Sequence, residues 1–115
     1  MGFYKHIEHA VGTYVAAHYS RAIEAGIGTN TVAAELLAES GALLRCTDVR
    51  NVALPAHLGF SKDDIFEPDL SLYAGADVLY AIRPAIEMIP PLIAIARAIN
   101  CDLLVCHLGF ELYGN

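Results

Sequence analysis

The stretch Arg21-Ala22-Ile23-Glu24-Ala25-Gly26-Ile27-Gly28 decides the fold predicted for this chain. A short apolar segment runs into two glycines one residue apart, a helix-forming segment follows, and the next apolar run ends at Asp48. Glycine lets the backbone turn tightly and approach a ligand closely, and the start of the helix offers free N–H groups. A carboxylate after the second strand can accept hydrogen bonds from ribose hydroxyls. This order of features predicts a nucleotide-binding βαβ unit.

The composition bounds the size and the class of the protein. The 115 residues suffice for a single domain with its own core and are too few for two. Hydrophobic residues make up 56% and charged residues 17%, which predicts a sheet covered on both faces, a subunit that hides apolar surface in a homo-oligomer, or both. The net charge of −6, with only seven scattered basic residues, argues against nucleic acid as a partner.

Neither a secretory signal nor a membrane span is expected. The N-terminus enters a helical pattern directly, and the uncharged run from Met88 to Ala96 is too short to cross a bilayer. Three cysteines without framework spacing fit a reducing compartment, so a cytoplasmic protein is predicted. No metal site is expected, because Cys101, Cys106 and His107 lack the spacing of tetrahedral ligands.

Apolar runs alternate with helical patterns along the whole chain. Helices are expected at residues 3–19, between residues 29 and 41, and at 90–99, and strands at 22–25, 42–47, 62–65, 78–82 and 103–106, with a tail to residue 115. Strands that alternate with helices at this spacing are parallel and joined by right-handed crossovers. The expected fold is a three-layer α/β domain over residues 1–115, with a mostly parallel sheet of about five strands flanked by helices. Ligands are expected at the carboxyl ends of those strands.

Eight residues are predicted to form the binding site at these strand ends: Glu24, Gly26, Gly28, Asp48, Asp63, Asp64, Tyr80 and Arg83. The glycines can also make a tight turn without a ligand. Asp48 can cap a loop instead of binding a ribose. Whichever of Asp63 and Asp64 points outward can belong to a solvated acidic turn.

Arg83 follows a buried apolar strand and stands directly before a proline that favours extended backbone. Its guanidinium can clamp a carboxylate of the chain, or it can bind a carboxylate or phosphate of a ligand. The acids nominated for the clamp are Glu24, Asp63 and Glu87. Tyr80, at alternate spacing from Ile82, packs in the core or stacks on a base.

Together these residues resemble the class I methyltransferase superfamily, the Rossmann-like proteins that bind S-adenosylmethionine. The first motif of that superfamily, Glu-x-Gly-x-Gly, matches Glu24 to Gly28. The resemblance implies that Asp48 holds the ribose and that Asp63 or Asp64 lies near the adenine. It also implies that Tyr80 to Pro84 ends at the reaction side.

A closer resemblance is to a small archaeal family, uncharacterised protein family 0146. The residues that carry it are Tyr73-Ala74-Gly75-Ala76, Leu79 to Pro84, Glu87, Asp63-Asp64-Ile65 and Glu24 to Gly28. The resemblance covers the chain from the first predicted helix to the last predicted strand and implies a Rossmann-like fold.

Two departures from the methyltransferase pattern shape the functional expectation. Asn30 stands at the third motif glycine, and the chain ends soon after the fifth predicted strand, without the antiparallel edge found in methyltransferases of this type. The leading hypothesis is a small protein that binds S-adenosylmethionine or a related adenosyl or nucleotide ligand, with methyl transfer left open. The alternative is a degenerate, non-catalytic core that acts as an oligomerising or regulatory subunit. A nicotinamide-dependent oxidoreductase is the third hypothesis, and no catalytic residue is assigned.

Overall fold

A computed structural model describes residues 2–107 and 110–113 of the chain. Its α-helices are α1 (Gly2–His18), α2 (Val32–Ser40) and α3 (Ile89–Ile99). Its strands are β1 (Ala22–Ala25), β2 (Leu43–Asp48), β3 (Phe60–Lys62), β4 (Val78–Ile82), β5 (Asp102–Cys106) and β6 (Phe110–Tyr113). Short 3-10 helices, η1 (Ala56–Leu58), η2 (Leu70–Leu72) and η3 (Ile86–Met88), lie between these elements.

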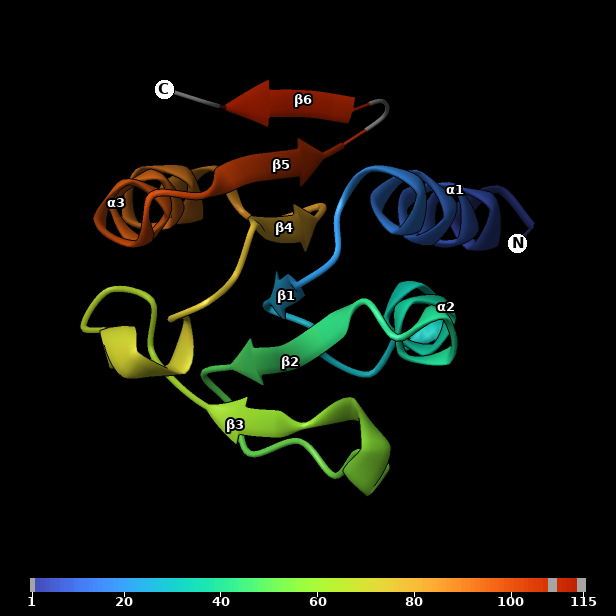
Figure 1. Ribbon diagram of the computed structural model, residues 1–115, viewed down its shortest axis with the longest axis horizontal. Coiled ribbons are helices and arrows are strands. Elements are labelled where there is room, and N and C mark those ends of the chain that lie inside the picture. Colours follow the sequence, from blue (N-terminus) through green and yellow to red (C-terminus); the bar gives the residue numbers. More distant parts are fainter. Residues whose placement is uncertain (1, 108–109, 114–115) are drawn as a thin grey trace.

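The strands form one sheet in the order β3-β2-β1-β4-β5-β6. Strands β1 to β5 are parallel to their neighbours, and β6 is antiparallel to β5. Helices α1 and α2 cover one face of the sheet and α3 covers the other (Figure 1). The structure thus confirms the predicted three-layer, Rossmann-like α/β fold.

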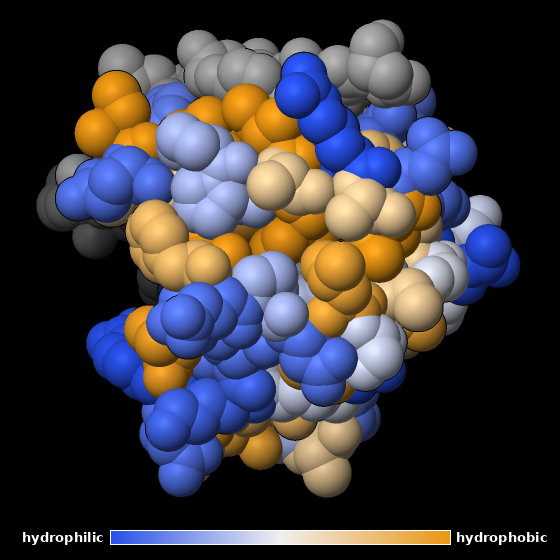
Figure 2. All heavy atoms as spheres, turned by 90° about the vertical axis from the view of Figure 1, so that its left-hand side faces the viewer, coloured by the Kyte–Doolittle hydropathy of each residue, from blue (hydrophilic) through white to orange (hydrophobic). Residues whose placement is uncertain are grey.

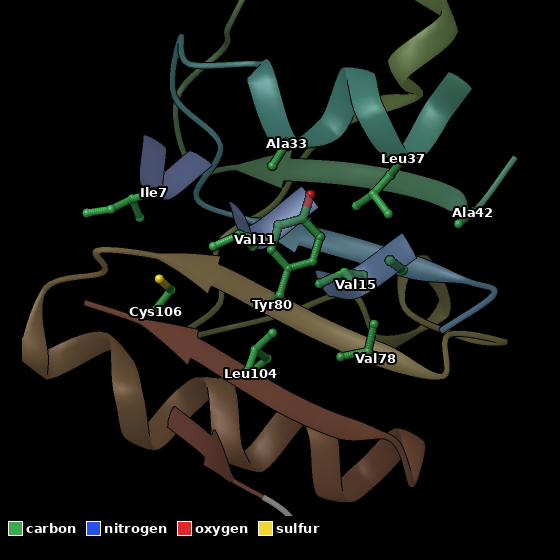
Figure 3. Packing of buried hydrophobic residues seen from close by; sticks show 11 residues of the cluster. Ile7, Val11, Val15, Ala33, Leu37, Ala42, Val78, Tyr80, Leu104 and Cys106 are labelled. Carbon is green, nitrogen blue, oxygen red and sulfur yellow. The ribbon is translucent and has the colours of Figure 1, made fainter. Parts of the chain in front are cut away.

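Burial on both faces explains why β4 is apolar at every position apart from the hydroxyl of Tyr80. Along β4, Val78 and Tyr80 pack with α1 and α2, while Leu79 and Ala81 pack with α3. Tyr80 stands in the middle of the first of these clusters, beside Val11 of α1 (Figure 3). Side chains alternate between the two faces of a strand, so both clusters draw on the same short segment.

Two expectations about the strands are wrong. The third strand was expected at residues 62–65, but β3 ends at Lys62, so Asp63 begins the loop after the strand. Residues beyond the fifth strand were expected to form only a tail. Instead, β6 pairs with β5, with Phe110 opposite Cys106. The antiparallel edge is therefore present. The short strand at this edge pairs with backbone groups of β5 that would otherwise lack hydrogen-bond partners.

No helix within the described residues has both the length and the apolar character needed to cross a bilayer. Over the same part of the chain, no group of three or more His, Cys, Asp and Glu side chains is placed to hold a metal ion.

Candidate functional site

A pocket of about 460 Å³ opens at the carboxyl ends of β1, β2 and β3. The residues that line it are Gly26, Thr47, Asp48, Val49, Arg50, Asp63, Asp64, Ile65, Phe66 and Met88. Its volume falls within the range of roughly 300 to 1,000 Å³ that small-molecule sites occupy. The structure therefore brings four of the eight predicted site residues, Gly26, Asp48, Asp63 and Asp64, to one cavity.

A larger and more open depression of about 730 Å³ lies along the outer side of α2. It is lined in part by His57 and Glu35, whose Nε2 and Oε1 atoms are 2.6 Å apart. None of the eight predicted residues lines it. The 460 Å³ pocket is the candidate site, because ligands of open α/β sheets bind at the carboxyl ends of the strands.

The turn after β1 is held by the end of β2. The amides of Gly26 and Ile27 both donate to the carbonyl oxygen of Thr47, at 2.8 and 3.1 Å. The amide of Gly28 donates to Oδ2 of Asp48 at 2.8 Å. Gly26 and Gly28 have φ angles of 70° and 59°, in the left-handed region that glycine tolerates. The glycines do make the predicted tight turn, but all three amides are used within the protein.

Asp48 connects the loops that follow β1 and β2. Besides the amide of Gly28 on Oδ2, its Oδ1 accepts hydrogen bonds from the backbone N of Arg50 at 2.9 Å and from Nε of Arg50 at 3.3 Å. Burial acts to raise the pKa of Asp48, but these hydrogen bonds and the Arg50 charge outweigh it and hold the pKa below its usual value. Asp48 is thus ionised at neutral pH and has the loop-capping role.

Asp63 and Asp64 reach the pocket and also hold its wall in place. Oδ2 of Asp63 accepts a hydrogen bond from the buried hydroxyl of Tyr73 at 2.7 Å, and its Oδ1 accepts one from the amide of Asp69 at 3.0 Å. Oδ1 of Asp64 accepts a hydrogen bond from the amide of Phe66 at 3.0 Å. This turn places the ring of Phe66, 58% exposed, against the pocket.

Glu24 and Tyr80 lie in the layer beneath α1 and α2 and do not line the pocket. The hydroxyl of Tyr80 donates to Oε1 of Glu24 at 2.7 Å, and both side chains are fully buried. Burial raises the pKa of Glu24 to about 8; the hydrogen bond from Tyr80 lowers it, and the neighbouring Glu8 raises it further. Tyr80 therefore takes the core-packing role among its two alternatives.

Arg83 lies beside an acid that was not nominated as its partner. Its Nη2 is 4.0 Å from Oε2 of Glu8 in α1, whose side chain is 3% exposed. Burial raises the pKa of Glu8, while the Arg83 charge and the backbone amide of Ala33 in α2 lower it. Arg83 has a φ of 49°, and its own amide donates to the carbonyl oxygen of Cys106 at 2.6 Å. This arginine joins α1 to the end of β4, outside the pocket.

Several residues that line the pocket were missed by sequence reasoning, among them Arg50, Phe66 and Met88. Arg50 and Phe66 each stand two residues after a predicted acid, and this proximity was the only sequence signal available. Met88 comes from η3 and has no such signal. It closes the pocket beside the glycine turn, since a Cβ on Gly26 would lie 3.3 Å from its Cε.

Comparison with known proteins adds a family to this geometry. Residues 7–113 match the model of the Uncharacterised protein family (UPF0146). The chain is 34% identical over 96 residues to the UPF0146 protein of Archaeoglobus fulgidus, covering 83% of this chain and 74% of that protein. It is 34% identical over 101 residues to a UPF0146 protein of Halobacterium salinarum (88% and 78%). It is 37% identical over 92 residues to one of Pyrococcus abyssi (76% and 70%).

Proposed function

The chain belongs to the family UPF0146, and from that premise we propose that it binds a small adenosyl or nucleotide ligand in the 460 Å³ pocket, with S-adenosylmethionine as the first candidate. One observation carries this proposal. At the ligand-binding edge of a Rossmann-like sheet, the pocket combines apolar walls with carboxylates whose positions are held by hydrogen bonds.

The walls suit a purine base. Ile65, Phe66 and Met88 supply apolar surface, and an exposed phenylalanine ring can stack on the face of a base. Oδ2 of Asp64 has no hydrogen-bond partner among the described residues and can accept from an exocyclic amino group.

Asp48 retains a limited capacity for a ribose. A carboxylate has about four acceptor positions, and three of these hold Gly28 and Arg50. One position on Oδ2 is left for a single ribose hydroxyl. The loop-capping and ribose-binding roles of Asp48 are therefore compatible.

The glycine turn supports a mononucleoside ligand over a dinucleotide. A dinucleotide fold binds its pyrophosphate with amides of this turn and of the following helix. Here the amides of Gly26, Ile27 and Gly28 already have acceptors within the protein. If S-adenosylmethionine is the ligand, it supplies a transferable methyl group, and methyl transfer is the corresponding activity.

Calorimetric titration tests the proposal, with adenosine, S-adenosylmethionine, S-adenosylhomocysteine, NAD and ATP as ligands. We expect heat with at least one of the first three. Replacing Phe66 by Ala removes the stacking surface and should weaken binding by about 1–3 kcal/mol. Leu70→Ala is the matched control, since Leu70 is 42% exposed on η2 and does not line the pocket. Absence of heat with every adenosyl compound would sink the proposal.

A second candidate, an oligomerising or regulatory subunit, is favoured by the exposed large hydrophobic residues. In the described part of the chain these are Val49, Phe66, Leu70 and Ile86. All four lie in segments that follow β2, β3 or β4 at the carboxyl edge. Hydrophobic residues also lie exposed among hydrophilic ones on the side of α3 (Figure 2). Grouped exposed apolar residues are typical of interaction surfaces.

Light scattering during size exclusion separates this candidate from a purely ligand-binding role. Ile86, 82% exposed, is the most accessible of the four. If the carboxyl edge is an interface between copies, the protein elutes as an oligomer and Ile86→Ser shifts it toward the monomer. A monomer at all concentrations, or an oligomer indifferent to Ile86→Ser, rejects this interface.

A further inference from the structure

Ten of the described residues line the pocket, and Arg50 is the one cation among them. Its backbone N and its Nε both donate to Oδ1 of Asp48. The other carboxylate oxygen of Asp48, Oδ2, accepts a hydrogen bond from the amide of Gly28 in the glycine turn. The guanidinium lies beside Gly28, because a Cβ on Gly28 would be 3.1 Å from Nη2 of Arg50. Asp48 therefore positions the Arg50 side chain at the pocket.

The outer half of the Arg50 guanidinium is available to a ligand. Among the described residues, neither Nη1 nor Nη2 has a hydrogen-bond partner, and the side chain is 69% exposed. A guanidinium held through Nε presents its two Nη groups in a planar fork, the geometry that matches a carboxylate or a phosphate.

Five main-chain donors of the glycine turn and the start of α2 have acceptors within the protein. The amides of the glycine turn bind Thr47 and Asp48. At the start of α2, the amide of Val32 donates to Oδ1 of Asn30 at 3.2 Å, and the amide of Ala33 acts on the carboxyl of Glu8. These five amides, which belong to the usual anion-binding site of a βαβ unit, thus interact with oxygen atoms of the protein itself.

From these contacts we propose that Arg50 determines ligand specificity: its Nη groups bind one anionic group, a phosphate or a carboxylate, attached to the nucleoside in the pocket. The inference rests on the proposed function and deepens it. It replaces main-chain recognition of the anion, the mode expected from the glycine motif, with recognition by a side chain.

The charges around the pocket limit how much negative charge a ligand can carry. Asp48, Asp63 and Asp64 line the same cavity, so its described lining holds three carboxylates and one guanidinium. Like charges at close range oppose binding. A ligand with a single anionic group is therefore favoured, and a triphosphate is disfavoured.

Titration calorimetry with four probes tests this specificity: adenosine, adenosine 5′-monophosphate, S-adenosylhomocysteine and ATP. We expect the wild-type protein to bind the monophosphate or S-adenosylhomocysteine about tenfold more tightly than adenosine, and ATP less tightly than the favoured of these two. The monophosphate and S-adenosylhomocysteine distinguish a phosphate from a carboxylate. Added salt should weaken the binding of the charged ligand and leave the binding of adenosine unchanged.

Variants at Arg50 locate the effect. Arg50→Gln should abolish the preference for the charged ligand while adenosine still binds, and Arg50→Lys should keep part of it, because a lysine retains the charge without the planar fork. Lys62→Gln is the matched control: Lys62 is an exposed cation at the end of β3 that does not line the pocket.

The outcomes separate the two claims. If no adenosyl compound binds the wild type, the proposed function itself fails. If adenosine binds as tightly as the charged probes, or Arg50→Gln keeps the preference, the pocket stands and the role of Arg50 is overturned. Equal loss of adenosine and charged ligand in Arg50→Gln would make Arg50 a structural residue only, and this too overturns the inference.

Discussion

Replacement of Glu24 by Gln should make the protein more stable at neutral pH. Glu24 is 2% exposed, and the Tyr80 hydroxyl donates to it at 2.7 Å. Burial raises its pKa from 4.5 to about 8, with Glu8 adding to the effect. Glutamine has nearly the same shape as the protonated acid and accepts the same hydrogen bond, but it does not titrate.

Proton linkage gives the direction and the size of the change in the free energy of unfolding with pH. Between pH 4.5 and about 8 the folded protein holds a proton on Glu24 that the unfolded chain releases, so the free energy of unfolding falls as pH rises. Each pH unit in this window costs about 1.4 kcal/mol. The contribution of this proton to the free energy of unfolding is fully present below pH 4.5, and about 3 kcal/mol of that contribution is lost by pH 7. The glutamine variant should not show this loss.

Urea unfolding followed by far-UV circular dichroism measures the difference, since the chain contains no tryptophan. Between pH 5.5 and 7.5 the free energy of unfolding of the wild type should fall by about 2–3 kcal/mol more than that of Glu24→Gln. Asp48 stays ionised throughout this range, because its pKa is lowered. Glu39→Gln, at an exposed position of α2, is the control and should follow the wild type. Parallel pH profiles for wild type and Glu24→Gln would refute the assignment of a buried, protonated Glu24.

Other substitutions test the packing by thermal unfolding. Gly12→Val should destabilise the protein by about 1–3 kcal/mol, because a Cβ there would lie 3.1 Å from Cα of Ala33 where α1 crosses α2; an unchanged midpoint would mean that the helices are farther apart. Tyr73→Phe removes a hydroxyl bonded to Asp63 and should cost about 1–3 kcal/mol; no loss would show that this bond is not formed. Leu92→Ala opens a cavity under α3 and should cost about 2–5 kcal/mol, and a smaller effect would contradict its complete burial.

Local patterns predicted the fold well for a physical reason. The run from Val78 to Ile82 is apolar at every position except a tyrosine, and this composition is typical of a strand buried on both faces. The strand β6 was missed because four residues next to an edge carry little periodicity. Their pairing depends on β5, which lies alongside only after folding. The predicted position of β3 was wrong for the same reason, since its three residues are defined by pairing with β2.

The candidate site could be predicted in part. One cavity does bring together Gly26, Asp48, Asp63 and Asp64, because the carboxyl ends of adjacent parallel strands lie at the same edge of the sheet. Glu24 and Tyr80 were placed at the same edge, yet the alternation of side chains along β1 and β4 turns both toward α1 and α2. Sequence spacing alone did not indicate which face of the sheet would carry the pocket.

By itself, the sequence determined the order of the helices and of β1 to β5 along the chain, the glycine turn after Glu24 and the acids at the strand ends, because backbone preferences and hydrophobic periodicity are local properties. The tertiary structure alone decided which groups remain available to a ligand. The register of β1 against β2 directs the amides of Gly26 and Ile27 to Thr47. The packing of α1 brings Glu8 to Arg83, 75 positions away along the chain. Hydrogen bonds between distant segments exist only after folding. Here the amide of Gly28 bonds to one oxygen of Asp48, while the other oxygen of Asp48 holds Arg50 at the pocket.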